Sequence, residues 1–181
     1  GVSFLQRFLP EFEKAEQEFG VPKEIIAAII GIESSYGSIT GRERVIDSLS
    51  TLAFDYPRRS KFFTKQLEHF LLLTREEKLD PLVMKGSYAG AMGYGQFIPS
   101  SYRSYAIDFD DDGIRNIVTN PIDAIGSVAN YLSSHGWERN ATIAEPLTKN
   151  DVNSNFKTSL SLKELDALEL VSKINLPNKK Y

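Results

Sequence analysis

The sequence lacks cysteine and contains only two histidines, His69 and His135, among its 181 residues. Without cysteine the chain cannot form a disulfide, use a thiol nucleophile or bind zinc through thiolates, although this indicates nothing about its compartment. Two histidines are too few for a histidine-rich metal site. His69 has apolar neighbours, and we expect it to be half-buried packing rather than a ligand.

Long apolar runs and a strong net charge are missing as well. No run of about 18 apolar residues occurs, so the sequence predicts no membrane span. The net charge is only -3 at pH 7, which argues against the broad basic surface that a nucleic-acid-binding protein needs. The first residues show no basic segment followed by an apolar one, so we expect the sequence to begin after any export signal.

The composition, 41% hydrophobic and 25% charged, is typical of a globular domain. We expect residues 1–140 to form this domain. Residues 141–181 are more polar and are expected to form a loop, a short helix and a tail. Ser161 and Glu164 have the spacing of a capping box at the start of that short helix.

Apolar residues recur at spacings of three and four, which predicts helices. No segment alternates apolar and polar residues convincingly, so we expect a mainly α fold with little or no β structure. The expected helices are residues 4–19 with a stop at Gly20, residues 21–37, a helix from Val45 that Pro57 closes, a helix after Arg59 that buries Phe62, Phe63, Leu67, Phe70 and Leu71, and a helix from Pro121 that stops at Gly136.

Glu33 stands out as the one ionisable residue on the apolar side of the helix predicted over residues 21–37. It follows Ile26, Ile29 and Ile30 at spacings of seven, four and three, which places the carboxyl group on the isoleucine side of the helix. Burial there would favour the neutral carboxyl group, as general-acid catalysis near neutral pH requires. The alternative is a structural glutamate that pairs with an arginine or bonds to a loop.

The second informative stretch is GSYAGAMGYGQFIPSSY, residues 86–102. Its glycines allow close approach of the backbone to a ligand or another segment. Its aromatic rings and amide offer stacking faces and directional hydrogen bonds, which suit a sugar. A tight turn packed in the core is the alternative. The candidate contacts are Ser87, Tyr88, Gln96 and Phe97.

Arg58 and Arg59 are adjacent at the start of a predicted helix. A guanidinium group offers a fork of donors, so this pair suits a groove for carboxylates or sugar hydroxyls. Two ordinary surface charges are the alternative. Tyr131, on the helix that begins at Pro121, is either a core aromatic or a wall of the groove.

An aspartate-rich segment follows, DFDDDGIRNIVTNPID, residues 108–123. Asp108, Asp110, Asp112 and Gly113 occupy positions one, three, five and six of a calcium loop, and Ile114 would give a backbone carbonyl at position seven. Thr119 replaces the usual glutamate at position twelve, and Asp123 would supply a late carboxylate. Alternatively, Asn120, Pro121 and Asp123 open the next helix, and both roles can hold together. Sodium or magnesium could replace calcium.

These segments, in this order, resemble the membrane-bound lytic murein transglycosylase B family, glycoside hydrolase family 103. The resemblance rests on IIGIESSYG, DYPRRSKFF, the glycine-rich and aspartate-rich stretches and NPIDAIGSVANYLSSHGW, and covers roughly residues 12–137. Several long motifs in register are more specific than any one of them.

The resemblance implies a lysozyme-like α domain with an EF-hand-like metal loop. It also implies cleavage of the β-1,4 bond between N-acetylmuramic acid and N-acetylglucosamine in peptidoglycan, with formation of a 1,6-anhydro ring. Glu33 would be the single catalytic acid and then the base. Substrate contacts would come from Arg58, Arg59, Ser87, Gln96 and Tyr131, and metal ligands from Asp108, Asp110, Asp112 and Asp123.

The resemblance further implies a periplasmic protein, in its full form an outer-membrane lipoprotein, which we expect to act as a monomer on glycan strands with no organic cofactor. Family members usually continue further and add aromatic residues to the groove, whereas this sequence ends in a short polar segment. A murein-binding module without turnover and a lysozyme-type hydrolase of the same bond therefore stay open as alternatives.

Overall fold

The computed structural model describes residues 1–141, of which Gly1–Arg139 form one compact unit. The helix predicted at Ser161 and Glu164 lies outside the described residues. Within the described part, helices dominate and each strand has two residues. In chain order the elements are α1 (Val2–Arg7), α2 (Leu9–Phe19), α3 (Lys23–Ser34), β1 (Glu43–Arg44), α4 (Val45–Asp55), α5 (Ser60–Glu76), β2 (Lys85–Gly86), α6 (Pro99–Tyr105) and α7 (Pro121–Ser134).

The first predicted helix is interrupted, so the prediction of one helix over residues 4–19 is wrong. Phe8 separates α1 from α2, with φ of -116° and ψ of 31°. Pro10 stands in the first turn of α2, where its missing N–H is not needed; inside one continuous helix it would remove a hydrogen bond and clash with the preceding turn. The predicted stop is confirmed, since Gly20 caps α2 in the left-handed conformation with φ of 74°.

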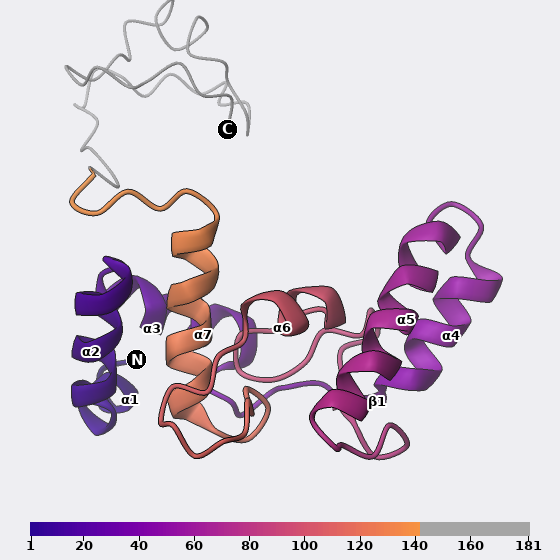
Figure 1. The fold of residues 1–181 in the computed structure, drawn as a ribbon, viewed down its shortest axis with the longest axis horizontal. Helices are drawn as coiled ribbons and strands as arrows, with labels where there is room; N and C mark the ends of the chain where they lie inside the picture. Colours follow the sequence, from indigo (N-terminus) through magenta and orange to yellow (C-terminus); the bar gives the residue numbers. More distant parts are fainter. Residues whose placement is uncertain (142–181) are drawn as a thin grey trace, which may run out of the picture. The chain divides into compact units, whose positions relative to one another are not determined.

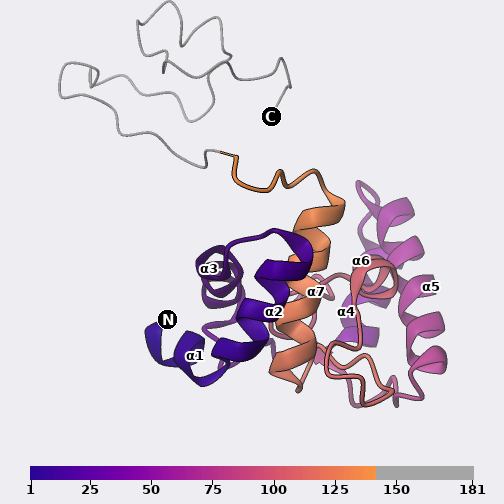
Figure 2. The same ribbon diagram turned by 60° about the vertical axis from the view of Figure 1, so that its left-hand side comes forward.

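The core lies between helices from both halves of the described chain. α2 packs against α3 and α7, while α5 packs against α4 and α6. α6 lies between α7 and the hairpin that α4 and α5 form (Figures 1 and 2). The side chains without exposed surface include Phe12, Ile26, Ile30, Leu49, Phe70 and Ile125.

The buried face of α5 is partly as predicted: Phe63 and Phe70 are buried, and Phe62 and Leu67 pack half-buried against the core. The prediction is wrong for Leu71, which is 47% exposed, while Gln66 and Leu73 are buried in addition. The buried residues follow each other at spacings of three and four, and Leu71 lies about 100° around the helix from Phe70. Gln66 is satisfied inside because its Oε1 accepts a hydrogen bond from the Ser100 N–H at 3.0 Å.

The strands β1 and β2 pair antiparallel, with Glu43 opposite Gly86. This pairing holds the loop after α3 against the start of the glycine-rich stretch. Gly41 makes the closest approach: it has φ of 104°, and a Cβ atom there would lie 1.9 Å from the carbonyl carbon of Gly86. Only glycine fits this position.

The substitution Gly41→Ala should therefore destabilise the fold. Overpacking against a backbone that cannot yield costs about 1–3 kcal/mol, and alanine at a positive φ adds strain. Urea unfolding measures the loss. Gly136→Ala is the matched control, because Gly136 has φ of 91° but nothing within 4 Å of an added Cβ. Equal losses for the two variants would contradict the close approach at Gly41.

Candidate active site and cation loop

Glu33 lines a pocket of about 340 Å³ that four segments form together. Gln96 and Phe97 enter from the glycine-rich stretch and Tyr131 from α7, so these predicted residues share one pocket with Glu33. Among the residues that line it, Glu33 carries the only carboxylate. The remaining lining residues are Ile29, Gly95, Ile98, Ser101, Val128 and Leu132.

Glu33 is exposed, so the prediction that the fold buries it is wrong. The fully buried stripe of α3 runs through Ile26 and Ile30 to Ser34, which is 1% exposed. Glu33 instead lies four residues after the half-buried Ile29, at the edge of the stripe, and both residues face the pocket. The carboxyl group is thus open to a ligand in the free protein.

Gln96 is held rigidly at the pocket. Its backbone adopts the left-handed conformation with φ of 49°, a costly state that surrounding contacts must maintain and that is common at functional sites. Its Nε2 donates to the carbonyl oxygens of Thr40 at 3.1 Å and Gly93 at 2.9 Å. With both amide hydrogens engaged, Oε1 is the atom of this side chain that can accept a hydrogen bond from a ligand.

Aromatic packing fixes the opposite wall of the pocket. The Tyr131 ring lies 5.4 Å from the Phe97 ring centroid and stacks on His135 at 4.0 Å. Tyr105 packs edge-on against Tyr131 at 5.3 Å. Tyr131 therefore belongs both to an aromatic cluster and to the wall, so the two interpretations of this residue are compatible.

The other predicted sugar contacts lie outside this pocket. Ser87 closes a turn, since its Oγ accepts hydrogen bonds from the N–H groups of Ala89 at 3.3 Å and Ala91 at 3.1 Å. Tyr88 is 79% exposed. Arg58 and Arg59 line a separate basic hollow with Lys61, Phe62 and Lys65. The Arg59 guanidinium lies 4.3 Å from the Phe62 ring centroid.

The structure adds pocket residues that the sequence did not suggest. Ile29 could have been found, because it precedes Glu33 by one helical turn. Ser101 could not, because nothing in the run Pro99, Ser100, Ser101 indicates which hydroxyl group faces the pocket.

Three of the predicted metal ligands converge. Carboxylate oxygens of Asp108, Asp110 and Asp123 lie within 4.8 Å of one another. Asp112 is not in this converging group; its Oδ1 accepts a hydrogen bond from the N–H of Ile114 at 2.8 Å, and Asp112 stays a predicted ligand. The carbonyl group of Ile114 stays a predicted ligand.

Asp123 is the buried member of this group and has no exposed surface. Its two oxygens accept hydrogen bonds from the N–H groups of Phe109 at 2.8 Å and Asn116 at 2.7 Å. Burial raises the pKa of the Asp123 carboxyl group; the two N–H donors oppose this, and the charges of Asp110 and Asp108 add to it. Such converging hard oxygens suit a calcium ion, which would offset both burial and repulsion.

The alternative role of this segment, to open α7, holds at the same time. The Asn120 side chain accepts a hydrogen bond from the N–H of Ile122 at 2.9 Å, as an N-cap does. Its Nδ2 donates to Asp110 at 2.9 Å. Helix capping and the acidic group therefore share one hydrogen-bond network.

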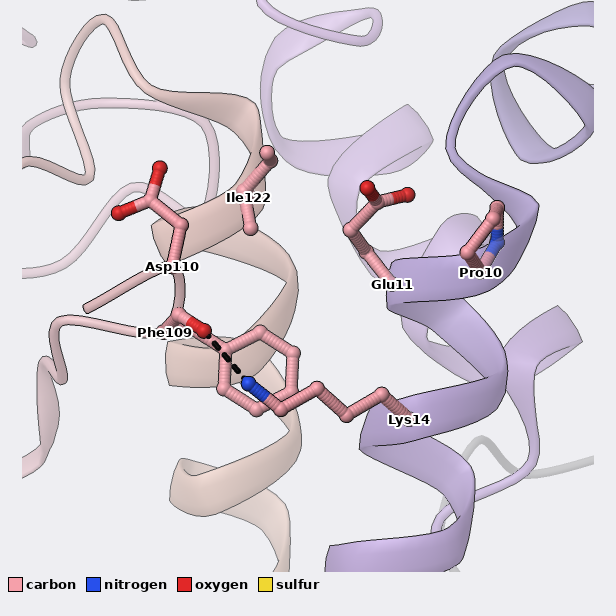
Figure 3. A pocket seen from close by; sticks show the side chains of 6 residues that line it. All are labelled: Pro10, Glu11, Lys14, Phe109, Asp110 and Ile122. Atoms are coloured by element: carbon pink, nitrogen blue, oxygen red, sulfur yellow. Dashed lines mark hydrogen bonds between the residues drawn. The ribbon is translucent and has the colours of Figure 1, made fainter. Parts of the chain in front are cut away.

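A small pocket of about 230 Å³ separates this loop from α2 (Figure 3). Lys14 crosses it: its Nζ donates to the carbonyl oxygen of Phe109 at 2.8 Å and lies 4.1 Å from the Phe109 ring centroid. Glu11 and Asp110 line the pocket from α2 and from the loop. Lys14 thus fastens the loop to α2 next to the carboxylate group.

Calcium should raise the melting temperature of this protein. A ligand that binds only the folded state at a hundred times its Kd stabilises it by about 2.7 kcal/mol. Without a cation, the raised pKa of Asp123 favours the fold at low pH, and that contribution is lost as the pH rises through the folded-state pKa. Calcium requires the ionised carboxylate, so its stabilising effect should grow with pH over the same range.

Differential scanning fluorimetry with calcium or EDTA, at several pH values, measures this effect. Asp110→Asn is a suitable variant, because Asp110 is exposed and the substitution should spare the fold while it weakens the response to calcium. A melting temperature that responds neither to calcium nor to EDTA would show that the loop binds no cation and only caps α7.

Comparison with known proteins identifies relatives over nearly the whole chain. A family model described as transglycosylase SLT domain matches residues 1–178. The chain is 47% identical over 180 residues to membrane-bound lytic murein transglycosylase B of Escherichia coli strain K12, an alignment that covers 98% of this chain and 50% of that protein. The chain therefore spans about half the length of this relative.

Solved structures are similar to this one as well. The Escherichia coli lytic transglycosylase SLT35 in complex with calcium has a TM-score of 0.81 and 48% identity, over 93% of this chain and 54% of that chain. SltB3 from Pseudomonas aeruginosa in complex with NAG-anhNAM-pentapeptide has a TM-score of 0.72 and 40% identity, over 76% of this chain and 36% of that chain. The predicted fold class, mainly α and lysozyme-like with little β structure, is confirmed, as is the resemblance to lytic murein transglycosylases.

Proposed function

This chain belongs to the transglycosylase SLT domain family, and from that premise we propose that it is a peptidoglycan lytic transglycosylase. It cleaves the β-1,4 bond between N-acetylmuramic acid and N-acetylglucosamine and forms 1,6-anhydromuramic acid. The observation that carries this proposal is a pocket with one carboxylate, Glu33, whereas most glycoside hydrolases use two. The anhydro sugar bound to the related SltB3 supports the same product.

In this mechanism Glu33 acts twice. Its carboxyl group protonates the glycosidic oxygen, and the bond from that oxygen to C1 of the muramoyl residue breaks. The resulting carboxylate then removes the proton from the C6 hydroxyl group of the same residue as its oxygen attacks C1. The N-acetyl group of the substrate stabilises the positive charge that develops at C1, in place of a second carboxylate.

Because Glu33 is exposed in the free protein, the bound substrate itself must shield the carboxyl group from water. A glycan strand that fills the pocket excludes water from the carboxyl group and strengthens its electrostatic interactions. Phe97 and Tyr131 form the wall on which a sugar ring packs, and Oε1 of Gln96 accepts a hydrogen bond from it. Bound substrate thus completes an environment that the free protein leaves open.

Arg58 and Arg59 contact a more distant part of the strand, together with Ser87 and Tyr88. α5 reaches the pocket where Gln66 bonds to Ser100, next to Ser101 of the pocket wall. Arg59 is the N-cap of α5 and precedes the buried Gln66 by seven residues, so about 10 Å of chain along the helix separates the two. A strand that leaves the pocket along α5 therefore meets the basic hollow.

The aspartate-rich loop of residues 108–123, here called the cation loop, would hold a structural calcium ion through Asp108, Asp110 and Asp123; the related SLT35 structure is in complex with calcium. We place the protein in the periplasm, as a monomer on glycan strands, with an outer-membrane lipoprotein as the full form; the related protein is named membrane-bound. None of the helices described here is both long and apolar enough to cross a membrane.

Digestion of purified murein, with mass spectrometry of the products, tests the proposal. The expected result is release of fragments that end in 1,6-anhydromuramic acid. Fragments with a reducing muramic acid would instead show a lysozyme-type hydrolase. Binding to murein sacculi without release of fragments would show a binding module, since the chain spans only half of its curated relative.

A further inference from the structure

Ser34 directly follows Glu33 and is one of the few polar side chains that the described part of the chain buries, with 1% exposure. It is the last residue of α3. A buried hydroxyl group must be hydrogen-bonded to offset the loss of water. Its partners therefore show what this residue does for the fold.

The hydroxyl group of Ser34 connects α3 to the glycine-rich stretch. Its Oγ lies 2.8 Å from the carbonyl oxygen of Tyr94 and 3.1 Å from that of Ile30. One hydroxyl proton cannot serve both acceptors fully, and the shorter distance favours Tyr94. The following residue, Gly95, and then Gln96 and Phe97 line the same pocket as Glu33. The bond thus joins two walls of the pocket, one residue away from a lining residue on each side.

The same oxygen also closes the turn after α3. Ser35, Tyr36 and Gly37 all have left-handed backbones, with φ of 49°, 59° and 83°. The first two have side chains, for which this conformation is costly. The N–H of Gly37 donates to Ser34 Oγ at 3.0 Å, and the N–H of Ile39 donates to the Ser34 carbonyl oxygen at 2.8 Å.

The connection continues to the cation loop. The N–H of Tyr94 donates to the carbonyl oxygen of Ile117 at 3.1 Å, and Ile117 directly follows Asn116, whose N–H bonds to Asp123. Gly93 packs against the same carbonyl group, where an added Cβ would lie 2.3 Å from the oxygen. The turn that contains Tyr94 is therefore held on two sides, by Ser34 and by Ile117.

We propose that Ser34 is a positioning residue: its hydroxyl group holds the end of α3 against Tyr94 and so sets the distance between Glu33 and the Gln96 side of the pocket. This proposal rests on the proposed function of Glu33. Ser34 does not line the pocket and takes no part in proton transfer. Its effect is on the geometry in which the acid meets the glycosidic oxygen.

The test is the kinetics of Ser34→Ala on purified murein. Small misplacements of a catalytic group have large effects on rate, so kcat should fall by about 10- to 100-fold. KM should change by less than about twofold, because the side chains that contact the sugar are retained. Ser34→Thr keeps the hydroxyl group and should recover most of the lost kcat.

Ser127→Ala is the matched control, because Ser127 is a fully buried serine of α7 whose Oγ accepts a hydrogen bond from the N–H of Ile107 at 2.9 Å. It should destabilise the fold by a similar amount and leave kcat near the wild-type value. A kcat of Ser34→Ala within twofold of that of Ser127→Ala would overturn the positioning role.

Amide hydrogen exchange separates this inference from the proposed function, because it needs no turnover. In Ser34→Ala the turn that contains Tyr94 loses its bond to α3, so the N–H of Tyr94, which donates to Ile117, should exchange at least about tenfold faster, whereas Ser127→Ala should leave it unchanged. If the wild-type chain releases no anhydro product, the proposed function fails, but faster exchange at Tyr94 still supports the connection. Unchanged exchange at Tyr94 would overturn the connection even in an active enzyme.

Discussion

Replacing Glu33 with glutamine should reduce the rate of glycan-strand cleavage by about a thousandfold or more, because a general acid or base alone contributes about 10²- to 10⁴-fold. In the proposed mechanism one carboxyl group serves both steps, and no second carboxylate lines the pocket to take over either of them. Glutamine has nearly the same shape but cannot donate a proton to the leaving oxygen or accept one from the C6 hydroxyl group. The fold should be unaffected, since Glu33 is exposed.

Release of anhydromuropeptides from murein measures this effect, with circular dichroism and thermal melting as checks on the fold. Glu24→Gln is the matched control: Glu24 lies in the first turn of the same helix, 3.7 Å from Lys23, and does not line the pocket. It should retain wild-type turnover. Substantial activity in Glu33→Gln would refute a single-acid mechanism.

The helices were predictable because periodicity and end signals agreed in most of them. α4 ends at Asp55, just before Pro57, and α7 begins at Pro121 behind the N-cap Asn120. Errors arose where the local backbone conformation overrides the periodic pattern. Pro10 divides the first helix, and α3 ends at Ser34 because the following three residues are left-handed, although only one of them is glycine.

The site was predictable as a set of segments but not as a geometry. Spacing along α3 cannot distinguish Ile30 in the centre of the buried stripe from Glu33 at its edge, because both follow the same helical period. The separation of Arg59 from the pocket depends on the direction of α5, and the hydrogen bond that the Ile114 N–H donates to Asp112 depends on a local turn. The position of Glu33, the separation of Arg59 and the turn at Asp112 all depend on contacts in the folded protein. The pattern of residue types along the sequence does not reveal these contacts.

Removal of the Asp123 side chain should have the largest effect on stability. In Asp123→Ala the N–H groups of Phe109 and Asn116 lose their acceptors. A buried donor without a partner costs about 1–3 kcal/mol, so the loss of two acceptors should lower the free energy of unfolding by about 2–6 kcal/mol even in EDTA. Urea unfolding in EDTA measures this loss without any contribution from a cation.

A second comparison separates the backbone anchor from the cation. Asp110→Asn weakens the acidic group but leaves both bonds to Asp123 intact, so it should match the wild type in EDTA and lose stability only in calcium. Asp123→Ala should be destabilised in both conditions, because Asp123 fixes the loop to α7 through the two N–H groups whether or not an ion is bound. If Asp123→Ala were as stable as the wild type in EDTA, then the ion, and not the buried carboxylate, would hold the loop that supports Tyr94 and the wall of the pocket.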